Sequence, residues 1–325
     1  MHLIDSYNRK LDYLRISLTD RCNFRCVYCM PPEGITLLPK NEVLSLEEIG
    51  RLAGIFISLG TKKIRLTGGE PLLRKNIVSL VRDLASVAGL EELGLTTNGF
   101  FLAPLAHELK ANGLSSVNIS IDSLNRLRFH HVTRTDSFED VFAGFMASLE
   151  AGLKVKVNVV AMNDLGEKEV ESFVELAKKF PVELRFLEFM PLCGSAWQSE
   201  KRLSLSQLKQ WVSSHCSLVP IPRGRNVADT FQIEGHEGKI GFISSMSEPF
   251  CGDCSRLRLT STGMLRLCLF SPLEMDLRTP LRQGALDEEI AALITRSVLQ
   301  KPKGHEEYLE KTKYSELPKI RSVGG

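Results

Sequence analysis

The stretch LRISLTDRCNFRCVYCMP, residues 14–31, joins a short run of alternating apolar residues to three closely spaced cysteines. The first five residues predict a β-strand, because side chains on a strand point alternately to its two faces. Cys22, Cys26 and Cys29 follow, with three and two residues between them. A strand that runs into a loop of metal-binding side chains is typical of α/β barrels, whose functional groups lie on the loops after the strands.

Units of one strand and one helix recur through the first two-thirds of the chain. Each apolar or alternating run is followed by a stretch in which apolar residues recur at helical spacing. Capping-box patterns at Ser45–Glu48 and Ser137–Asp140 indicate the starts of two helices. The six strands are expected at residues 14–18, 63–67, 93–97, 116–122, 155–162 and 183–189.

Alternating strands and helices predict a parallel sheet with helical crossovers. Six units are too few for a closed eight-fold barrel, which leaves a partial (β/α)6 barrel of the TIM type or an open doubly wound sheet. The phosphate-binding patterns GxGxxG and GxxxxGK(S/T), which accompany two common forms of the open sheet, do not occur. We therefore expect an α/β fold with a partial (β/α)6 barrel over residues 1–200.

The pattern changes after residue 191. Strand-like and helical segments no longer alternate, and a Ser261–Gly263 turn between two alternating runs predicts a hairpin. We expect an α+β extension over residues 201–325, with a loosely structured polar tail from Lys301. Its helices are expected at 204–215 and 287–299, and its strands at 230–234, 239–244, 256–260 and 264–269.

Composition narrows the class of protein. Lys and Arg number 41 and Asp and Glu 39, a net charge of +2 that gives no support to a nucleic-acid or membrane partner. Residues 1–11 lack the apolar core of a signal peptide, and no apolar run reaches the roughly 18 residues of a membrane span. We expect a cytoplasmic protein whose eight cysteines stay reduced and serve as metal ligands or catalytic groups more often than disulfides.

The first cysteine trio favours an iron–sulfur cluster with an open corner. Three thiolates can hold three irons of a four-iron cubane and leave the fourth iron for a small molecule. A bacterial ferredoxin run would carry further cysteines, and a structural zinc site would need a fourth ligand nearby. The nearest histidine, His2, lies twenty residues before Cys22. Zinc remains the minor alternative at this trio.

A second trio consists of Cys251, Cys254 and Cys268, and it is split across the predicted hairpin. A zinc hook is the alternative here, since a CxxC pair with a distant cysteine is also typical of zinc sites. Zinc ribbons, however, pair two CxxC motifs, whereas here the partner is a single cysteine. Cys193 and Cys216 fit neither trio, and we interpret them as structural.

Cations in apolar strands suggest an anionic ligand. Arg256 and Arg258 are two residues apart on a predicted strand and so share a face, where guanidinium groups match phosphate oxygens. Such a pair is more often a solvated face. Arg15, Arg65 and Lys156 also lie within strands, where a cation is costly unless it is paired or points at an anion. Internal salt bridges are the alternative for these three.

Three segments carry a family resemblance. Residues 22–31 resemble the CxxxCxΦC signature of radical SAM enzymes, in which Φ is aromatic and which use S-adenosylmethionine (SAM). Residues 68–71, GGEP, resemble the loop that holds the amino group of SAM in that family. Residues 245–260, SMSEPFCGDCSRLRLT, resemble one subfamily, the GTP 3′,8-cyclases that begin molybdenum-cofactor biosynthesis. This last resemblance extends from Arg15 to Gly325.

The resemblance implies the cofactors and most of the site. It implies two [4Fe-4S] clusters, one at each cysteine trio, and SAM as cofactor. Positions that match SAM contacts are Tyr28, Gly69, Ser120 and Met190. Positions that match GTP contacts are Arg15, Arg65, Thr96, Lys156, Arg256, Leu257 and Arg258.

Further expectations follow from the same resemblance. Arg256 and Arg258 are expected to act in catalysis, and Gly324-Gly325 matches a tail that enters the active site. The role of Arg185 stays open. Ser255 stands where the family commonly has Asn, and the loop 223–231 lacks a Gly-Pro-Ala run of many bacterial members. Neither departure falls on a family ligand.

The implied reaction is radical cyclisation of GTP. A 5′-deoxyadenosyl radical removes hydrogen from C3′ of the ribose, and a bond from C3′ to C8 of guanine follows. The implied partners are GTP, an external low-potential electron donor, a downstream cyclic pyranopterin monophosphate synthase and a second copy of the chain. The alternatives are another radical SAM enzyme with an auxiliary cluster, a zinc-binding module without catalysis and a ferredoxin-like electron carrier.

Overall fold

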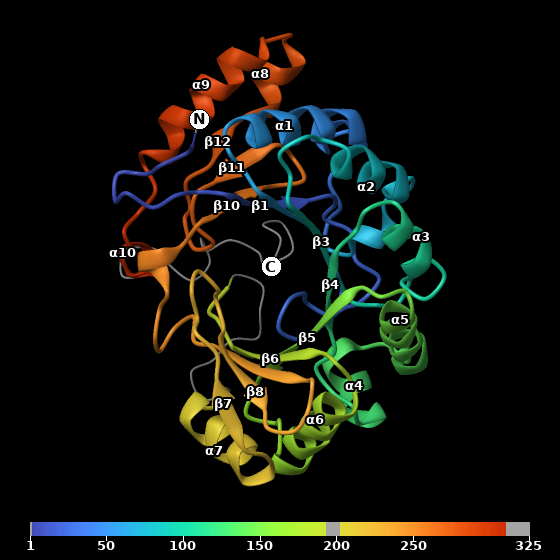
Figure 1. Cartoon of the computed structure of the whole chain (residues 1–325). Coiled ribbons are helices and arrows are strands. Elements are labelled where there is room, and N and C mark those ends of the chain that lie inside the picture. The colour runs from blue at the N-terminus through green and yellow to red at the C-terminus, as the bar shows by residue number, and fades with distance from the viewer. Residues whose placement is uncertain (1, 193–201, 310–325) are drawn as a thin grey trace.

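A computed structural model describes residues 2–192 and 202–309 of the chain. Its strands form one sheet of twelve, in the order β12-β11-β10-β1-β2-β3-β4-β5-β6-β9-β8-β7. The strands β1 to β6 curve in an arc, and the helices α1 to α6 lie outside it (Figure 1). Within the described residues the two ends of this order, β12 and β7, do not pair, so the barrel stays open.

The six strands of the arc are parallel and follow the chain in order, which confirms the partial (β/α)6 barrel. Each predicted strand begins and ends within one residue of its observed bounds, except that β4 ends at Ser120, two residues earlier than predicted. Their bounds are β1 Tyr13–Ser17, β2 Lys63–Thr67, β3 Glu92–Thr97, β4 Ser116–Ser120, β5 Lys154–Ala161 and β6 Glu183–Glu188. The crossover helices are α1 Leu46–Ser58, α2 Ile77–Ala85, α3 Ala106–Ala111, α4 Arg126–Thr133, α5 Phe138–Glu150 and α6 Glu167–Lys179.

The C-terminal extension continues the barrel sheet at both of its edges. An open six-stranded arc leaves two rows of unpaired backbone groups, and strands β10 and β9 pair with them in parallel. An antiparallel pair of strands then extends each edge. Next to β1 lie β10 Arg256–Leu259, β11 Met264–Arg266 and β12 Met275–Asp276; next to β6 lie β9 Lys239–Ile243, β8 Asp229–Ile233 and β7 Leu218–Pro220.

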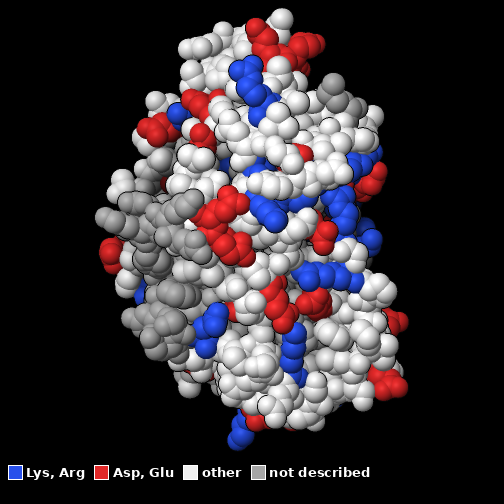
Figure 2. Space-filling view, turned by 90° about the vertical axis from the view of Figure 1, so that its left-hand side faces the viewer, with Lys and Arg blue, Asp and Glu red and all other residues white. Residues whose placement is uncertain are grey.

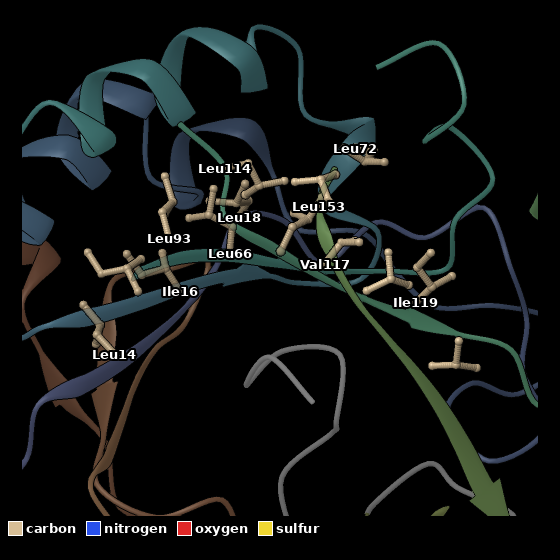
Figure 3. Close-up of a cluster of buried hydrophobic side chains, with 14 of the residues drawn as sticks. Leu14, Ile16, Leu18, Leu66, Leu72, Leu93, Leu114, Val117, Ile119 and Leu153 are labelled. Atoms are coloured by element: carbon tan, nitrogen blue, oxygen red, sulfur yellow. The ribbon is translucent and has the colours of Figure 1, made fainter. Parts of the chain in front are cut away.

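Alternation along the strands separates an apolar layer from a polar lumen. Leu14, Ile16 and Leu66 are buried on the side of the sheet that faces the helices (Figure 3). The residues between them, such as Arg15 and Ser17, therefore face the inside of the barrel. This layer of aliphatic side chains holds the helices against the sheet, which leaves the lumen free to carry polar groups.

Of the two predicted capping boxes, one forms in the structure. Ser45 accepts a hydrogen bond from the backbone of Glu48, and the Glu48 carboxylate accepts one from the backbone of Ser45. The second capping box does not form. Helix α5 begins after Ser137 as predicted, but the Ser137 hydroxyl makes its hydrogen bond with the Thr135 hydroxyl and does not cap the helix. The remaining helices are α7 Leu205–His215, α8 Arg278–Arg282, α9 Asp287–Val298 and α10 Glu306–Leu309, with short 3-10 turns at Lys40–Glu42, Pro71–Leu73 and Cys251–Asp253.

Charge is mixed over the face of the molecule that Figure 2 shows. On the face shown in Figure 2, basic and acidic side chains are interspersed, with no broad field of one sign. Among the described residues, no helix has both the length and the apolar character needed to cross a bilayer.

Candidate active site

One cavity brings the two cysteine trios together. All six cysteines line it, although the trios lie more than 220 residues apart in the sequence. The first trio follows β1, and the second flanks β10 and β11 at the neighbouring edge of the sheet. Because β10 is parallel to β1 and β11 is antiparallel to β10, the second trio lies at the opposite end of these strands from the first, and the cavity between them joins the two. The lining cysteines are Cys22, Cys26, Cys29, Cys251, Cys254 and Cys268.

The cysteines of the first trio are partly buried, and no neighbouring basic side chain offsets the effect of burial on the pKa of Cys22 and Cys26. Burial raises the pKa of Cys22 to about 11 and that of Cys26 well above its usual value. The Cys22 sulfur receives the Phe24 backbone N–H at 3.4 Å. A metal ion bound at these sulfurs would offset the effect of burial and favour the thiolate form. The chemistry of this trio therefore fits a metal centre.

The residues beside the first trio are held by a short hydrogen-bond chain. Tyr28 donates its hydroxyl proton to Asp122 at 2.6 Å, and Asp122 also accepts the Val160 backbone N–H at 2.9 Å. Burial raises the pKa of Tyr28 well above its usual range, so the phenol stays protonated and remains the donor. This chain links the cysteine loop after β1 to the ends of β4 and β5.

The Gly68-Gly69-Glu70 segment packs directly on the cysteine loop. A Cβ on Gly69 would lie 2.1 Å from the Arg21 carbonyl oxygen, so only glycine fits there. Glu70 is completely buried. Its carboxylate accepts hydrogen bonds from the backbone N–H groups of Leu72 and Asn98 and from the Thr97 hydroxyl. The glutamate therefore organises the loop after β2 and does not line the cavity.

The second trio has basic neighbours that the first trio lacks. The charges of Arg256 and Lys301 outweigh burial, which acts in the opposite direction, and lower the pKa of Cys254 to about 6. Cys251 begins a 3-10 turn, and Cys268 follows β11. The basic side chains therefore favour the thiolate form of Cys254, whereas burial raises the pKa of Cys251.

Sulfur spacing distinguishes a cluster from a single zinc ion. One tetrahedral zinc with bonds of about 2.3 Å would draw its sulfurs to about 3.8 Å from one another. Among residues 2–192 and 202–309, one group of three possible metal ligands has all its ligand atoms within 4.8 Å of one another, and it consists of Cys251, His305 and Glu306. The sulfurs of neither cysteine trio lie that close together. The wider separation fits ligands that bind different irons of one cluster.

A row of four arginines crosses the sheet beside the second trio. Cα pairing aligns Arg266 with Arg258, Arg258 with Arg15, and Arg15 with Arg65. Burial lowers the pKa of Arg258 well below its usual value, and the charges of Arg15 and Arg256 add to that effect. Arg266 pairs with Glu274 and Arg65 with Glu92, and a bound anion would further offset the cost of bringing these cations into the sheet.

Not every predicted cation reaches the cavity. Arg15, Arg256 and Arg258 line it, whereas Arg65 and Lys156 do not. Arg65 donates to Leu95, Ser116 and Asn118 at 3.0–3.1 Å, and Lys156 pairs with Glu183 at 3.1 Å. For these two, the structure shows the internal partners that the sequence left as an alternative.

The other predicted site residues divide in the same way. The Leu257 side chain is buried in the apolar core, so its side chain makes no part of the cavity wall. The predicted residues that line the cavity beside the cysteines are Arg15, Tyr28, Gly69, Thr96, Ser120, Met190, Arg256 and Arg258. Arg185 lines it as well and pairs with Glu183 at 2.5 Å. Cys193 and Gly324-Gly325 lie outside the described residues.

Sequence reasoning missed several buried polar residues of the cavity wall, among them Lys301 and His305. The expectation of a loose tail from Lys301 is wrong for residues 301–309, since Lys301 and His305 are about 95% buried and line the cavity. Their segment, KPKGH, has no periodicity, and its polar composition is typical of an exposed tail. Only an isolated histidine next to a short helix could have hinted at a buried role.

Two family models together span most of the chain. The radical SAM superfamily model matches residues 16–177, and the model described as Molybdenum Cofactor Synthesis C matches residues 182–307. The solved structure of Streptococcus suis SuiB bound to its precursor peptide SuiA is similar in fold, with a TM-score of 0.64 at 14% identity over 96% of this chain and 76% of that one. The chain is a member of the radical SAM superfamily.

Curated relatives define the family within that superfamily. This chain is 46% identical to the GTP 3′,8-cyclase of Thermodesulfovibrio yellowstonii over 99% of each chain. It is 43% identical to the mitochondrial GTP 3′,8-cyclase of Arabidopsis thaliana over 99% of this chain and 83% of the plant protein. It is 44% identical to molybdenum cofactor biosynthesis protein 1 of Drosophila melanogaster, of which it spans about half, 54%. The chain belongs to the GTP 3′,8-cyclase family.

Proposed function

We propose that this chain converts GTP to (8S)-3′,8-cyclo-7,8-dihydroguanosine 5′-triphosphate, the first step of molybdenum-cofactor biosynthesis. The observation that carries the proposal is one cavity lined by two separated cysteine trios and by Arg15, Arg256 and Arg258. An electron carrier needs no such shared cavity, and a zinc module needs sulfurs closer together. The named activity of the full-length relatives supports the same conclusion.

The two trios would divide the binding of cofactor and substrate. Cys22, Cys26 and Cys29 would hold one [4Fe-4S] cluster, and the second trio would hold another. When bound, the first cluster and SAM supply the 5′-deoxyadenosyl radical that starts the reaction. Residues 1–200 would form the unit that binds SAM, and residues 201–325 the unit that carries the second cluster and binds GTP.

Side chains of the cavity wall would place the two small molecules. Tyr28, Gly69, Ser120 and Met190 line the cavity at or after the carboxyl ends of β1, β2, β4 and β6, the strand ends at which the first trio also lies, and we assign them to SAM. Hydrogen transfer to a primary radical requires reacting atoms held roughly 3–3.5 Å apart, so the task of these residues is orientation and exclusion of water.

Arginines would hold the triphosphate and offset its charge. Arg15, Arg256 and Arg258 present guanidinium groups to the cavity from adjacent strands, and Thr96 adds a hydroxyl from β3. Arg256 and Arg258 lie closest in sequence to the second trio, and we assign them the catalytic role of controlling the product radical. Arg65 and Lys156 pair with Glu92 and Glu183 and would contact GTP only if they left these carboxylates. Leu257 would contact GTP through its backbone.

Other partners follow from the chemistry. An external low-potential donor must supply the electron, and a cyclic pyranopterin monophosphate synthase would consume the product. We also propose a homodimer in the cytoplasm.

The direct test is an anaerobic assay with SAM, dithionite and GTP. We expect about eight irons per chain, 5′-deoxyadenosine, and a cyclised nucleotide identified by mass. The Cys22→Ser, Cys26→Ser, Cys29→Ser triple variant is the control without the first centre. Stoichiometric zinc without iron would overturn the cluster assignment. SAM cleavage that leaves GTP unchanged would favour a different radical SAM enzyme with an auxiliary cluster.

A further inference from the structure

A segment near the described end of the chain, residues 301–305, packs on the loops of the second cysteine trio. Lys301 donates its ammonium protons to the carbonyl oxygens of Arg256, at 3.0 Å, and of Leu267. These residues lie two positions after Cys254 and one before Cys268. One buried ammonium group therefore connects two of the three ligand loops.

Arg9 fixes the same segment to the third ligand loop. Its guanidinium donates to the Cys251 carbonyl at 2.7 Å and to the Lys303 and Pro302 carbonyls at 2.9 and 2.5 Å. Arg9 is itself held by Asp5 at 2.6 Å. The position of residues 301–305 relative to Cys251 is thus determined by a buried ion pair from the N-terminal segment.

His305 contacts a ligand sulfur directly. Its Nδ1 lies 3.3 Å from Cys251 Sγ, and its ring lies on Phe270 with the ring centres 4.7 Å apart. The side chain is buried and has little room to turn away. A cysteine sulfur that binds iron is a thiolate and can only accept, so Nδ1 must carry the hydrogen of this contact.

The distance argues against His305 as a fourth ligand of the cluster. Each protein ligand of a four-iron cluster binds its own corner iron, and ligands on different corners diverge from one another. A nitrogen at hydrogen-bond distance from Cys251 Sγ therefore occupies no corner of its own. A single ion held by Cys251, His305 and Glu306 is the other possibility, but Glu306 is exposed, and Cys254 and Cys268 would be left without a metal.

We propose that His305 is a positioning residue that donates an N–H···S hydrogen bond to Cys251 and, together with the buried charge of Lys301, raises the reduction potential of the auxiliary cluster. The inference rests on the proposed function, because it presupposes a cluster at the second trio. Reduction adds negative charge to the cluster. Hydrogen bonds to its sulfurs and a nearby cation stabilise that charge, and both are known determinants of cluster potential.

The test measures the potential of each cluster in the assembled enzyme by anaerobic redox titration followed by electron paramagnetic resonance. We expect His305→Ala to move the auxiliary cluster to lower potential and to leave the SAM cluster unchanged. His305→Asn places an amide N–H near the position of Nδ1, and we expect it to restore most of the shift. His107→Ala, on the exposed face of α3, is the matched control.

Lys301→Met gives an independent arm. It keeps the length of the side chain and removes its charge, so we expect a further fall in the auxiliary potential. Lys303→Met, two residues away and exposed, should change neither cluster.

Several outcomes would overturn the inference. One is an auxiliary potential that is the same in His305→Ala, Lys301→Met and the two controls. Another is a strong nitrogen hyperfine coupling in the unsubstituted enzyme, which would make His305 an iron ligand. His305→Ala could fail to hold the auxiliary cluster at all, and the result for His305→Asn then decides. A cluster at near-native potential in His305→Asn supports the hydrogen bond, and loss of the cluster in both variants opposes it. Absence of any auxiliary signal in the unsubstituted enzyme would instead refute the proposed function.

Discussion

Arg258 is a buried cation whose neighbours across the sheet, Arg15 and Arg266, are also cations. Burial and the charges of Arg15 and Arg256 lower its pKa, a sign that the folded chain bears an electrostatic cost at this position. A triphosphate would offset that cost. At the scale of single residues, the site is therefore built for an anion, although the whole chain is nearly neutral.

Removal of Arg258 should weaken GTP binding. We expect Arg258→Ala to cost roughly 1.5–3 kcal/mol of binding free energy, the scale of a hydrogen bond to a charged group. Anaerobic equilibrium binding of GTP to the reconstituted protein measures this. Arg82→Ala, an exposed site on α2, should bind GTP normally. Equal affinities for the two variants would contradict the phosphate role of Arg258.

Tyr13 should titrate near neutral pH. It lies across from Arg256 and accepts a hydrogen bond from Arg65 at 2.9 Å. Burial alone would raise its pKa, but the charges of Arg65, Arg15 and Arg256 outweigh burial and lower the pKa to about 7. Between that pH and the ordinary tyrosine value of about 10, only the folded chain holds the phenolate, so the free energy of unfolding should rise with pH over this interval.

The ultraviolet difference spectrum between the parent protein and Tyr13→Phe reports this ionisation. We expect tyrosinate absorption to appear around neutral pH and to be missing from Tyr13→Phe. Tyr7→Phe, which removes an exposed tyrosine, should retain the transition. A first tyrosinate step that begins only near pH 10 in both variants would contradict the electrostatic account.

At the scale of elements, the loop after β2 must lie against the cysteine loop after β1. Gly69→Ala would bring a methyl group to 2.1 Å from the Arg21 carbonyl, which forces the two loops apart. We expect a loss of roughly 1–3 kcal/mol in stability, typical of overpacking, together with weaker SAM binding. Thermal unfolding and SAM binding measure the two effects.

Gly54→Ala is the matched control for that substitution. Gly54 lies within α1, and a Cβ there meets nothing within 4 Å. The substitution should raise stability by up to about 1 kcal/mol, because alanine favours helix over glycine. SAM affinity that is equal in Gly69→Ala and Gly54→Ala would show that the close approach of the two loops has no part in cofactor binding.

At the scale of the molecule, the two trios should fail in different ways. Cys29→Ser should abolish SAM cleavage, whereas Cys268→Ser should spare part of it and stop GTP turnover. Each variant should retain about four of eight irons. Parallel assays of 5′-deoxyadenosine and cyclised nucleotide, with iron analysis, separate the two functions. Equal loss of both activities in both variants would oppose a division of labour between the trios.

Local sequence was sufficient for most of the barrel. Strands β1 to β6 were predicted because their apolar faces bury the same aliphatic layer, a pattern that depends on neighbours two residues apart. The strands β7 and β12, three and two residues long, have no such pattern, and their existence depends on pairing with β8 and β11. Short edge strands are formed by their partners more than by their own sequence.

The sequence by itself determined the two cysteine trios, the order of strands and helices, and the family to which they belong, because spacing along the chain carries all three. Tertiary structure alone decided that β10 lies beside β1, that Arg65 and Lys156 have internal partners, and that His305 meets Cys251. These contacts join residues that are far apart in the chain, and no local periodicity encodes which of many polar residues a fold will bring together.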